Sequence, residues 1–173
     1  MKKIVVYKTS TGFTKRYAEW IAQALGCEAV SIKQESAKKL KDYELVIYGG
    51  GSIGGSINGL AKIKKLYTGQ MIVFQTGATP QEATEMIEAS AARNFTEEER
   101  KRIPYFYMHS GLNYEKMSPV EKMMMKMLKK MLAGKADKTE EDLEMERMIA
   151  GSFDECDKSY IDPLVEYVKN LEA

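Results

Sequence analysis

The chain of 173 residues has few of the residues that build metal centres, disulfide frameworks and catalytic triads. It contains two cysteines, one histidine and one tryptophan. Cys27 and Cys156 lie far apart with no CxxC or Cys/His spacing, so we expect reduced thiols and no metal site. One histidine, His109, gives no signal for a triad. The sequence therefore predicts no catalytic side chain.

Long hydrophobic runs and an excess of one charge are also absent. No apolar stretch approaches the roughly 20 residues of a membrane-spanning helix, and Met1-Lys2-Lys3 precedes no signal-peptide core. The net charge of +1 gives no reason to expect a nucleic-acid partner. We expect one cytoplasmic domain over residues 1–173, which is long enough to bury a sizeable core.

The hydroxyl-rich stretch at residues 9–14 follows an apolar run at residues 4–7. Helical spacing begins directly after it, with apolar side chains at Tyr17, Trp20, Ile21, Ala24 and Leu25. The pattern predicts a strand, a turn and a helix, with four hydroxyls around Gly12 and no acidic residue between Met1 and Lys15. Helix capping would account for one or two of these hydroxyls. The whole set at a helix N-terminus predicts a phosphate site.

Strand and helix patterns alternate along most of the chain. Strands are expected at residues 4–7, 28–32, 44–48, 71–74 and 103–108, and helices after the first strand, at 60–67 and at 81–92, with one or two turns within 33–42. Pro80 suits the first helical position, and Thr96 with Glu99 forms a capping box. The pattern predicts a doubly wound α/β fold with a five-stranded parallel sheet in the order 2-1-3-4-5 and a helical insertion after strand five.

Three loops follow strands at the edge where such sheets bind ligands: residues 9–14, 49–59 and 76–80. All three are small, polar and almost uncharged, and six of the eleven residues in the second are glycine. Gly54 and Gly55 can take the positive φ angles that other residues avoid. His109 is expected at the same edge of the sheet.

Two other nucleotide and signalling patterns are disfavoured. Gly49-x-Gly51-x-x-Gly54 matches a dinucleotide fingerprint, but no helix follows directly and no acidic residue closes the next strand. A phospho-acceptor receiver domain has this topology but needs acidic residues after strands one and three, where the chain has Lys8-Thr9 and Gly49-Gly50.

The first loop, Thr9-Ser10-Thr11-Gly12-Phe13-Thr14, resembles the FMN phosphate loop of the flavodoxin-like family, whose fold places FMN at a strand-order switch point. The other two loops resemble by position those that hold the isoalloxazine ring. The resemblance implies FMN as cofactor, bound by Thr9, Ser10, Thr11, Gly12, Phe13, Thr14, Gly50, Gly51, Ser52, Ile53, Gly54, Thr76, Gly77 and Ala78.

A closer similarity is to the flavodoxin-domain branch that includes quinone-dependent protoporphyrinogen dehydrogenase. It rests on residues 46–53, on Gly111-Leu-Asn-Tyr114, and on the Met/Lys-rich segment after Ser118. Asn113 stands where that branch has aspartate. Neither ring loop contains tryptophan or tyrosine, so Ile53, Ile57 or a residue of 109–114 is expected to cover the flavin.

These observations predict an FMN-binding protein that transfers electrons between redox partner proteins. The alternative is an FMN-dependent oxidoreductase of the protoporphyrinogen dehydrogenase (quinone) type, with a quinone as partner. A third possibility is a phosphate-binding interaction module that has lost flavin.

The segment 118–135 is the most unusual after the glycine-rich loop. Its apolar residues form one stripe, Val120, Met123, Met124, Met127, Leu128, Met131 and Leu132, and its lysines occupy the rest. We expect the stripe to pack on the sheet; the alternative is a docking surface. Six acids within residues 137–146 could pair with the lysines. Because such pairing would weaken lipid binding, we expect at most weak association with anionic membranes.

Overall fold

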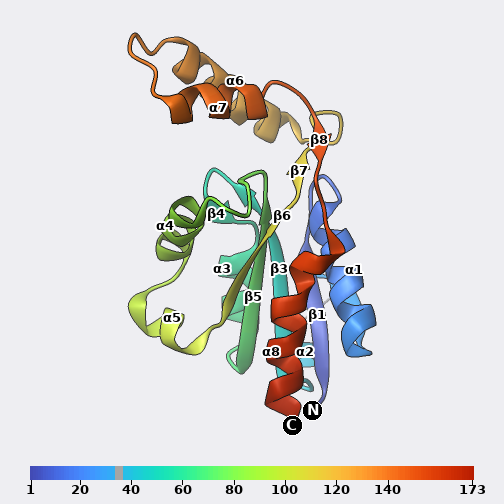
Figure 1. Ribbon diagram of the computed structural model, residues 1–173. Coiled ribbons are helices and arrows are strands. Elements are labelled where there is room, and N and C mark those ends of the chain that lie inside the picture. The colour runs from blue at the N-terminus through green and yellow to red at the C-terminus, as the bar shows by residue number, and fades with distance from the viewer. Residues whose placement is uncertain (34–36) are drawn as a thin grey trace.

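A parallel sheet forms the centre of the computed structural model, which describes residues 1–33 and 37–173. Its strands are β1 (Lys3–Lys8), β2 (Glu28–Ser31), β3 (Leu45–Ile53), β5 (Gln70–Gly77) and β6 (Tyr105–His109), in the order β2-β1-β3-β5-β6 (Figure 1). All four neighbouring pairs are parallel. The predicted α/β fold and strand order are confirmed.

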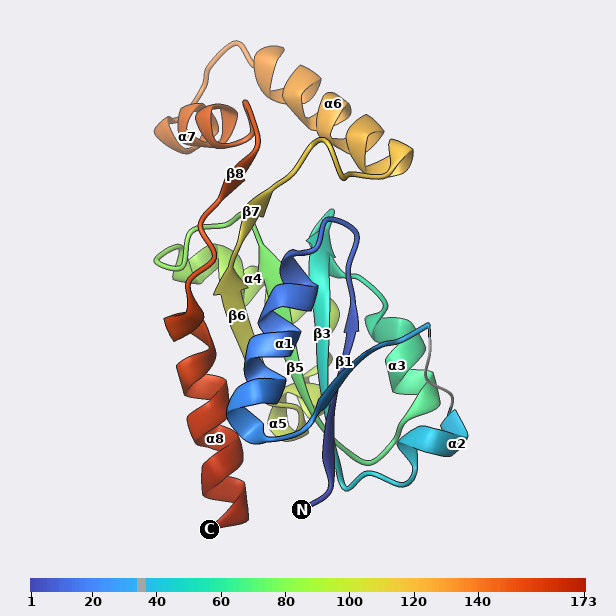
Figure 2. The same ribbon diagram turned by 90° about the vertical axis from the view of Figure 1, so that its right-hand side faces the viewer.

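Helices cover both faces of the sheet (Figure 2). On one face lie α1 (Phe13–Leu25) and α8 (Asp162–Glu172), and on the other lie α2 (Ala37–Leu40), α3 (Leu60–Leu66), α4 (Thr84–Asn94) and α5 (Glu97–Arg102). The helix α8 was not predicted. It follows a short 3₁₀ helix, η1 (Lys158–Ile161), and brings the C-terminus back beside the N-terminal strand.

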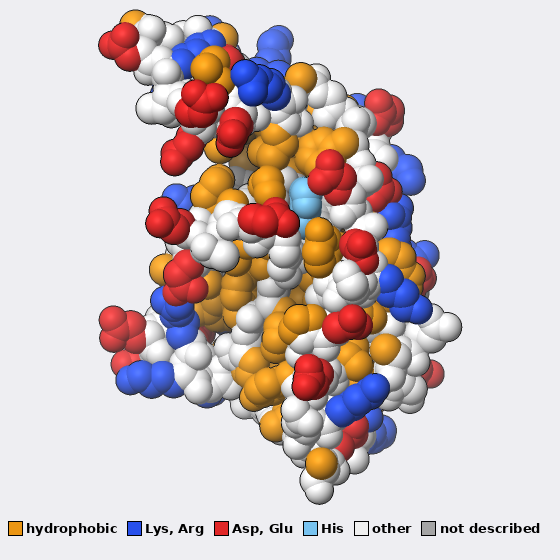
Figure 3. All heavy atoms as spheres, in the orientation of Figure 1, with side chains coloured by type: hydrophobic (Ala, Val, Ile, Leu, Met, Phe, Trp, Pro, Cys, Tyr) orange, Lys and Arg blue, Asp and Glu red, His pale blue; other side chains and the backbone are white. Residues whose placement is uncertain are grey.

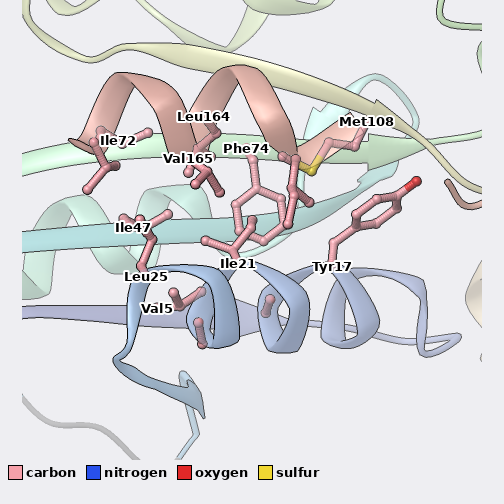
Figure 4. Packing of buried hydrophobic residues seen from close by; sticks show 14 of the residues in the cluster. Val5, Tyr17, Ile21, Leu25, Ile47, Ile72, Phe74, Met108, Leu164 and Val165 are labelled. Carbon is pink, nitrogen blue, oxygen red and sulfur yellow. The ribbon is translucent and has the colours of Figure 1, made fainter. Parts of the chain in front are cut away.

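The buried side chains form one cluster on each face of the sheet. In the cluster shown in Figure 4, strand residues Val5, Ile47 and Phe74 meet Ile21 of α1 and Leu164 of α8, and all five are fully or almost fully buried. Alternate residues of the same strands point to the other face, because successive side chains of a strand alternate. The site-bearing edge of the sheet is therefore fixed by a core on both sides.

The Tyr17 hydroxyl ties the first helix to two distant segments. It donates a hydrogen bond to the His109 carbonyl and accepts one from the Asp157 amide at 3.1 Å. The side chain is fully buried, and burial raises the pKa of its hydroxyl. This contact holds the ends of α1, β6 and the C-terminal segment together.

Removing this hydroxyl should take one hydrogen-bond partner from the buried His109 carbonyl and one from the partly buried Asp157 amide. We expect Tyr17→Phe to lower the free energy of unfolding by about 1–3 kcal/mol, measured by urea denaturation. Tyr167→Phe is the matched control, because Tyr167 is 38% exposed, and should change stability by less than about 0.5 kcal/mol. Equal effects of the two variants would contradict this role.

The expected start of the helix at residue 81 is wrong. The helix expected from residue 81 begins at Thr84, because residues 80–83 form a turn with an Ala83 amide to Pro80 carbonyl bond. Gln81 in this turn binds the end of β6 instead: its side chain accepts a hydrogen bond from the His109 amide and donates one to the Tyr107 carbonyl.

The capping box at Thr96 and Glu99 is confirmed. The helical turns expected within 33–42 fall partly outside the described residues, and α2 is their described part.

The glycine-rich segment is not one long loop. Strand β3 continues through Gly49, Gly50 and Gly51 to Ile53, and β4 (Ser56–Ile57) pairs back on it in an antiparallel hairpin. The expected strand end at Tyr48 is therefore wrong. Gly54 and Gly55 form the hairpin turn with φ of 56° and 81°, which confirms the expected positive angles.

The helical insertion after the fifth strand is confirmed as an arm at the carboxyl edge of the sheet (Figures 1 and 2). The arm consists of a two-stranded ribbon, β7 (Gly111–Leu112) with β8 (Phe153–Asp154), and two helices, α6 (Pro119–Ala133) and α7 (Glu140–Met148). We call α6 and α7 the helical hairpin. None of the described helices is both long and apolar enough to span a bilayer.

The expectation that the stripe of the 118–135 helix packs on the sheet is wrong. The ribbon carries α6 beyond the end of the sheet, and Val120, Met123, Met127 and Met131 remain more than half exposed. Leu132 of the same stripe is buried. The helix thus uses only part of its apolar surface to contact the rest of the chain.

Candidate cofactor site

The first loop turns sharply from β1 into α1. Gly12 has φ of 101°, and its amide donates to the Thr9 hydroxyl at 3.0 Å. The Gly12 carbonyl accepts the Arg16 amide, which starts the helix. The first turn of α1 carries no acidic side chain. Its N–H groups and the positive end of its dipole therefore form an anion-binding position at the edge of the sheet.

A hydroxyl pair joins the first loop to the third. Thr14 Oγ1 lies 2.8 Å from Thr76 Oγ1, and both residues are 2% exposed. Gly51 of the second loop lies beside this pair, since a Cβ added there would be 3.4 Å from Thr14 Oγ1 and 3.8 Å from Thr76 Oγ1. The three predicted loops therefore meet at one point.

A cavity of about 220 Å³ opens over this meeting point. Ten of the predicted cofactor-binding residues line it: Ser10, Thr11, Phe13, Thr14, Gly51, Ser52, Ile53, Thr76, Gly77 and Ala78. The other four lie around it, namely Thr9, Gly12, Gly50 and Gly54. Thr9 holds the turn through the Gly12 amide, whereas Gly50 is packed against the backbone of Asn58.

The far wall of the cavity comes from the arm. It is mostly apolar and is formed by Leu112, Asn113, Met117, Met125, Leu128, Met145, Met148 and Ile149. Of the residues expected to cover a flavin, Ile53 lines the cavity, but Ile57 is 4% exposed in the hydrophobic core and was wrongly assigned. The methionines of this wall were missed, because nothing in the sequence indicates which face of the helical hairpin turns toward the sheet.

The charges around the cavity are few. Among the described residues, Glu121 is the one carboxylate in its lining, and its side chain accepts a hydrogen bond from the Ser118 amide that caps α6. Near the first loop, Arg16 forms an ion pair with Asp154 at 2.8 Å. Partial burial alone would raise the pKa of Asp154, but hydrogen bonds from the Cys156 amide and Arg16 hold that pKa below its ordinary value. Arg16 and Asp154 were not found in the sequence analysis.

A second cavity of about 760 Å³ adjoins the first and shares Ala78, Met86, Met145 and Met148 with it. We call it the arm cleft. Figure 3 shows it as a hollow between the arm and the sheet domain, with hydrophobic side chains inside and the histidine at its edge. His109 belongs to its lining, as expected from its position at the end of β6. Its size lies within the range of small-molecule sites.

His109 is held tightly in the wall of the arm cleft. It is 5% exposed, its Nδ1 lies 3.6 Å from Glu155, and its ring is tilted against Phe153. Its Nε2 is buried and has no hydrogen-bond partner within the described part of the chain. Buried polar atoms are rarely left unpaired, so this nitrogen is a candidate contact for a bound molecule.

The cysteines are free thiols, as predicted. Burial and the nearby Asp154 raise the pKa of Cys156 to about 11, and burial also raises the pKa of Cys27. Because the thiolate is the reactive form, neither residue is set up as a nucleophile.

The residues of the first cavity fit FMN. The anion-binding turn suits a phosphate group, while Gly51 leaves open the space between the second and third loops. The apolar wall of the arm provides hydrophobic surface for a ring system. The binding of FMN by these residues stays a prediction.

Comparison with protein families gives a match over most of the chain. A model of the flavodoxin domain family matches residues 4–139. No protein with curated annotation matches this chain.

Comparison with solved structures gives distant similarities only. A flavodoxin from the domain Archaea is 15% identical, with 87% of this chain and 99% of that one covered at a TM-score of 0.41. Flavodoxin 2 from Bacillus cereus is 17% identical, with 70% and 90% covered at 0.41. A flavoprotein in complex with FMN from Lactobacillus acidophilus is 14% identical, with 62% and 91% covered at 0.38. The match over residues 4–139, rather than these distant neighbours, places the chain in the flavodoxin domain family.

Proposed function

We propose that this protein binds FMN and transfers electrons between redox partners. The observation that carries the proposal is the meeting of three uncharged loops, one of them an anion-binding turn, at a cavity on the carboxyl edge of the sheet. Bound FMN would supply the exchange of one or two electrons. The chain's own residues bind and orient it and control the access of water.

The phosphate group is held by the first loop. Ser10 and Thr11 line the cavity beside the free N–H groups of the first turn of α1. The Thr14 hydroxyl is less free to bind the phosphate, because it already forms a hydrogen bond with the Thr76 hydroxyl. Since phosphate oxygens only accept hydrogen bonds, Thr14 can donate to the phosphate only while it accepts from Thr76.

The ring is held between the second and third loops, with the arm above it. Gly51, Ser52 and Ile53 form one side of the cavity, and residues 76–78 form the other. Met125, Met145 and Met148 line the cavity on the side of the arm. Methionine sulfur makes favourable contacts with aromatic rings, so these side chains can cover a flavin without tryptophan or tyrosine. They also exclude water from it.

Electron transfer to a partner protein has a direct test. The FMN-loaded protein is reduced anaerobically and mixed with oxidised cytochrome c in a stopped-flow spectrophotometer. If the protein is an electron carrier, its reduced FMN should be oxidised at a rate that rises with cytochrome c concentration. Failure to transfer electrons, despite bound and reducible FMN, would contradict the carrier function.

The arm cleft favours a second candidate, an FMN-dependent oxidoreductase of the protoporphyrinogen dehydrogenase (quinone) type. A simple carrier needs no small-molecule site beside its cofactor, whereas this cleft adjoins the cofactor cavity and is lined by His109, whose buried Nε2 has no hydrogen-bond partner among the described residues. The lining of the cleft contains more acidic than basic side chains, with Glu141, Glu144 and Glu155 beside a single arginine, Arg147, among the described residues. This acidic lining suits a neutral quinone better than a tetrapyrrole that carries carboxylates.

Steady-state turnover separates the two candidates. An enzyme should show saturable oxidation of an electron donor by a soluble quinone, with protoporphyrinogen tested as the donor. His109→Leu should then lower kcat/KM for the quinone about tenfold, the value of one good hydrogen bond, while FMN affinity is unchanged. Turnover that does not saturate, or that His109→Leu does not change, would contradict the oxidoreductase and favour the electron carrier.

A further inference from the structure

The outward face of α6 carries the most exposed apolar side chains of the arm. Val120, Met123, Met127 and Met131 are 61%, 56%, 65% and 60% exposed. They recur every three or four residues, so they form one continuous stripe on the helix. We call this stripe the outer face of α6. Contiguous apolar surface of this kind marks an interaction site rather than an ordinary surface.

A different face of α6 holds the helix on the protein. Met125 and Leu128 line the cofactor cavity, and Leu132 is 2% exposed. At 100° per residue, these three lie roughly a third of a turn from the outer face. The apolar surface of the helix therefore extends over two adjoining faces, with Met124 between them, and the face that contains Leu132 makes the buried contacts. Within the described residues, the side chains of the outer face remain mostly exposed.

Lysines flank the outer face. Lys122, Lys126 and Lys130 are exposed on the third side of the helix. Lys129 is different, because its Nζ lies 4.4 Å from the centre of the Tyr114 ring and 3.4 Å from the Ala150 carbonyl. That contact holds the hairpin to the ribbon, whereas the other three lysines project from it.

The acidic segment after α6 does pair with lysines, but with different ones from those expected. Asp142 pairs with Lys135 and Glu146 pairs with Lys138, both beyond the end of the helix. We expected the acidic segment to neutralise the α6 lysines and so to weaken lipid binding. The ion pairs among the described residues do not neutralise those lysines.

We propose that the outer face of α6 docks on an anionic lipid surface. A helix with an apolar stripe bordered by lysines lies in the plane of a bilayer, with its stripe in the acyl boundary and its cations at the headgroups. A second copy of the chain fits this face less well, because two such faces would bring their lysines together. Figure 2 shows α6 at one pole of the molecule, where no other described element blocks its approach to a flat surface.

This docking would bring the arm cleft close to the bilayer. Helix α7, which packs beside α6 in the helical hairpin, forms one wall of the cleft, and a helix with its side chains is about 10 Å across. A lipid-soluble molecule could therefore pass from the bilayer to the cleft over a short path. This consequence rests on the proposed FMN function, whereas the docking itself does not.

Vesicle co-sedimentation tests the proposal on the full chain without added FMN. Vesicles of phosphatidylcholine with about 30% phosphatidylglycerol should bind the protein at about 100 mM salt, and pure phosphatidylcholine vesicles should not. Removal of three lysines in Lys122→Gln/Lys126→Gln/Lys130→Gln should weaken binding about 100-fold, at roughly fivefold for each lysine. Failure of the wild-type protein to bind the anionic vesicles would overturn the proposal.

A matched control separates position from total charge. Lys62→Gln/Lys65→Gln/Lys101→Gln removes three exposed lysines from α3 and α5 and should leave vesicle binding within about twofold. A second variant, Met123→Gln/Met127→Gln/Met131→Gln, keeps every lysine and should weaken binding at least tenfold, since the stripe no longer enters the acyl region. Circular dichroism verifies that each variant is folded. Undiminished binding by the methionine variant, or dimerisation through this face without lipid, would overturn the proposal.

Discussion

Thr11→Asp should weaken FMN binding at least 100-fold. Thr11 lines the cofactor cavity at the anion-binding turn, where the first turn of α1 carries no acidic side chain. The carboxylate would stand beside a phosphate of up to two negative charges and would replace a hydroxyl donor. Loss of one charge-assisted hydrogen bond costs roughly 1.5–3 kcal/mol of binding free energy, and charge repulsion increases this cost. The affinity for FMN should therefore fall at least 100-fold.

Flavin fluorescence quenching measures this effect, and Thr68→Asp is the control. Thr68 is exposed and lies in the connection between α3 and β5, at the opposite edge of the sheet from the first loop. This variant adds the same charge and should bind FMN like the wild type. Wild-type affinity in Thr11→Asp would show that the phosphate binds elsewhere.

Gly49→Ala should cause a large loss of stability although it adds only one methyl group. Gly49 lies in the central strand β3, directly between β1 and β5, and pairs in register with Phe74. A Cβ there would lie 2.0 Å from the Phe74 ring, which is fully buried. Because neighbouring strands fix the backbone on both sides, the ring must leave its position. We expect a loss of about 3 kcal/mol or more in the free energy of unfolding.

The control for this substitution is Gly151→Ala. An added Cβ at Gly151 would meet no atom within 4 Å, and its backbone is outside the left-handed region. Urea denaturation should therefore give a change below about 0.5 kcal/mol for Gly151→Ala. If Gly49→Ala were equally mild, the close approach of β3 and Phe74 would not exist in solution.

Much of the sheet and of the candidate site could be predicted from local patterns. Buried parallel strands give continuous apolar runs, and the run at residues 44–48 was found for that reason. The first loop was found because a phosphate site needs a hydroxyl-rich turn at a helix N-terminus, and both parts lie within a few residues. Thr14 and Thr76 are 62 residues apart, yet the topology of a parallel sheet brought them to the same edge.

Features that depend on distant partners could not be predicted. Glycine is rare within strands, so Gly49 and Gly50 indicated a loop, although the size of Phe74 requires glycine in the strand. Pro80 indicated a helix start, whereas the Gln81 side chain binds the end of β6 and delays the helix. Periodicity also gave α6 one broad apolar stripe. It could not indicate that Leu132 faces the protein while Met127 faces outward.

Isothermal titration with FMN and with riboflavin, which lacks the phosphate, tests the central claim most directly. We predict one FMN per chain with a Kd below about 1 µM, and riboflavin binding at least 100-fold more weakly, because the first loop has no phosphate to hold. Equal binding of the two flavins would contradict the phosphate site, and no heat from either flavin would contradict the assignment of the cavity to FMN.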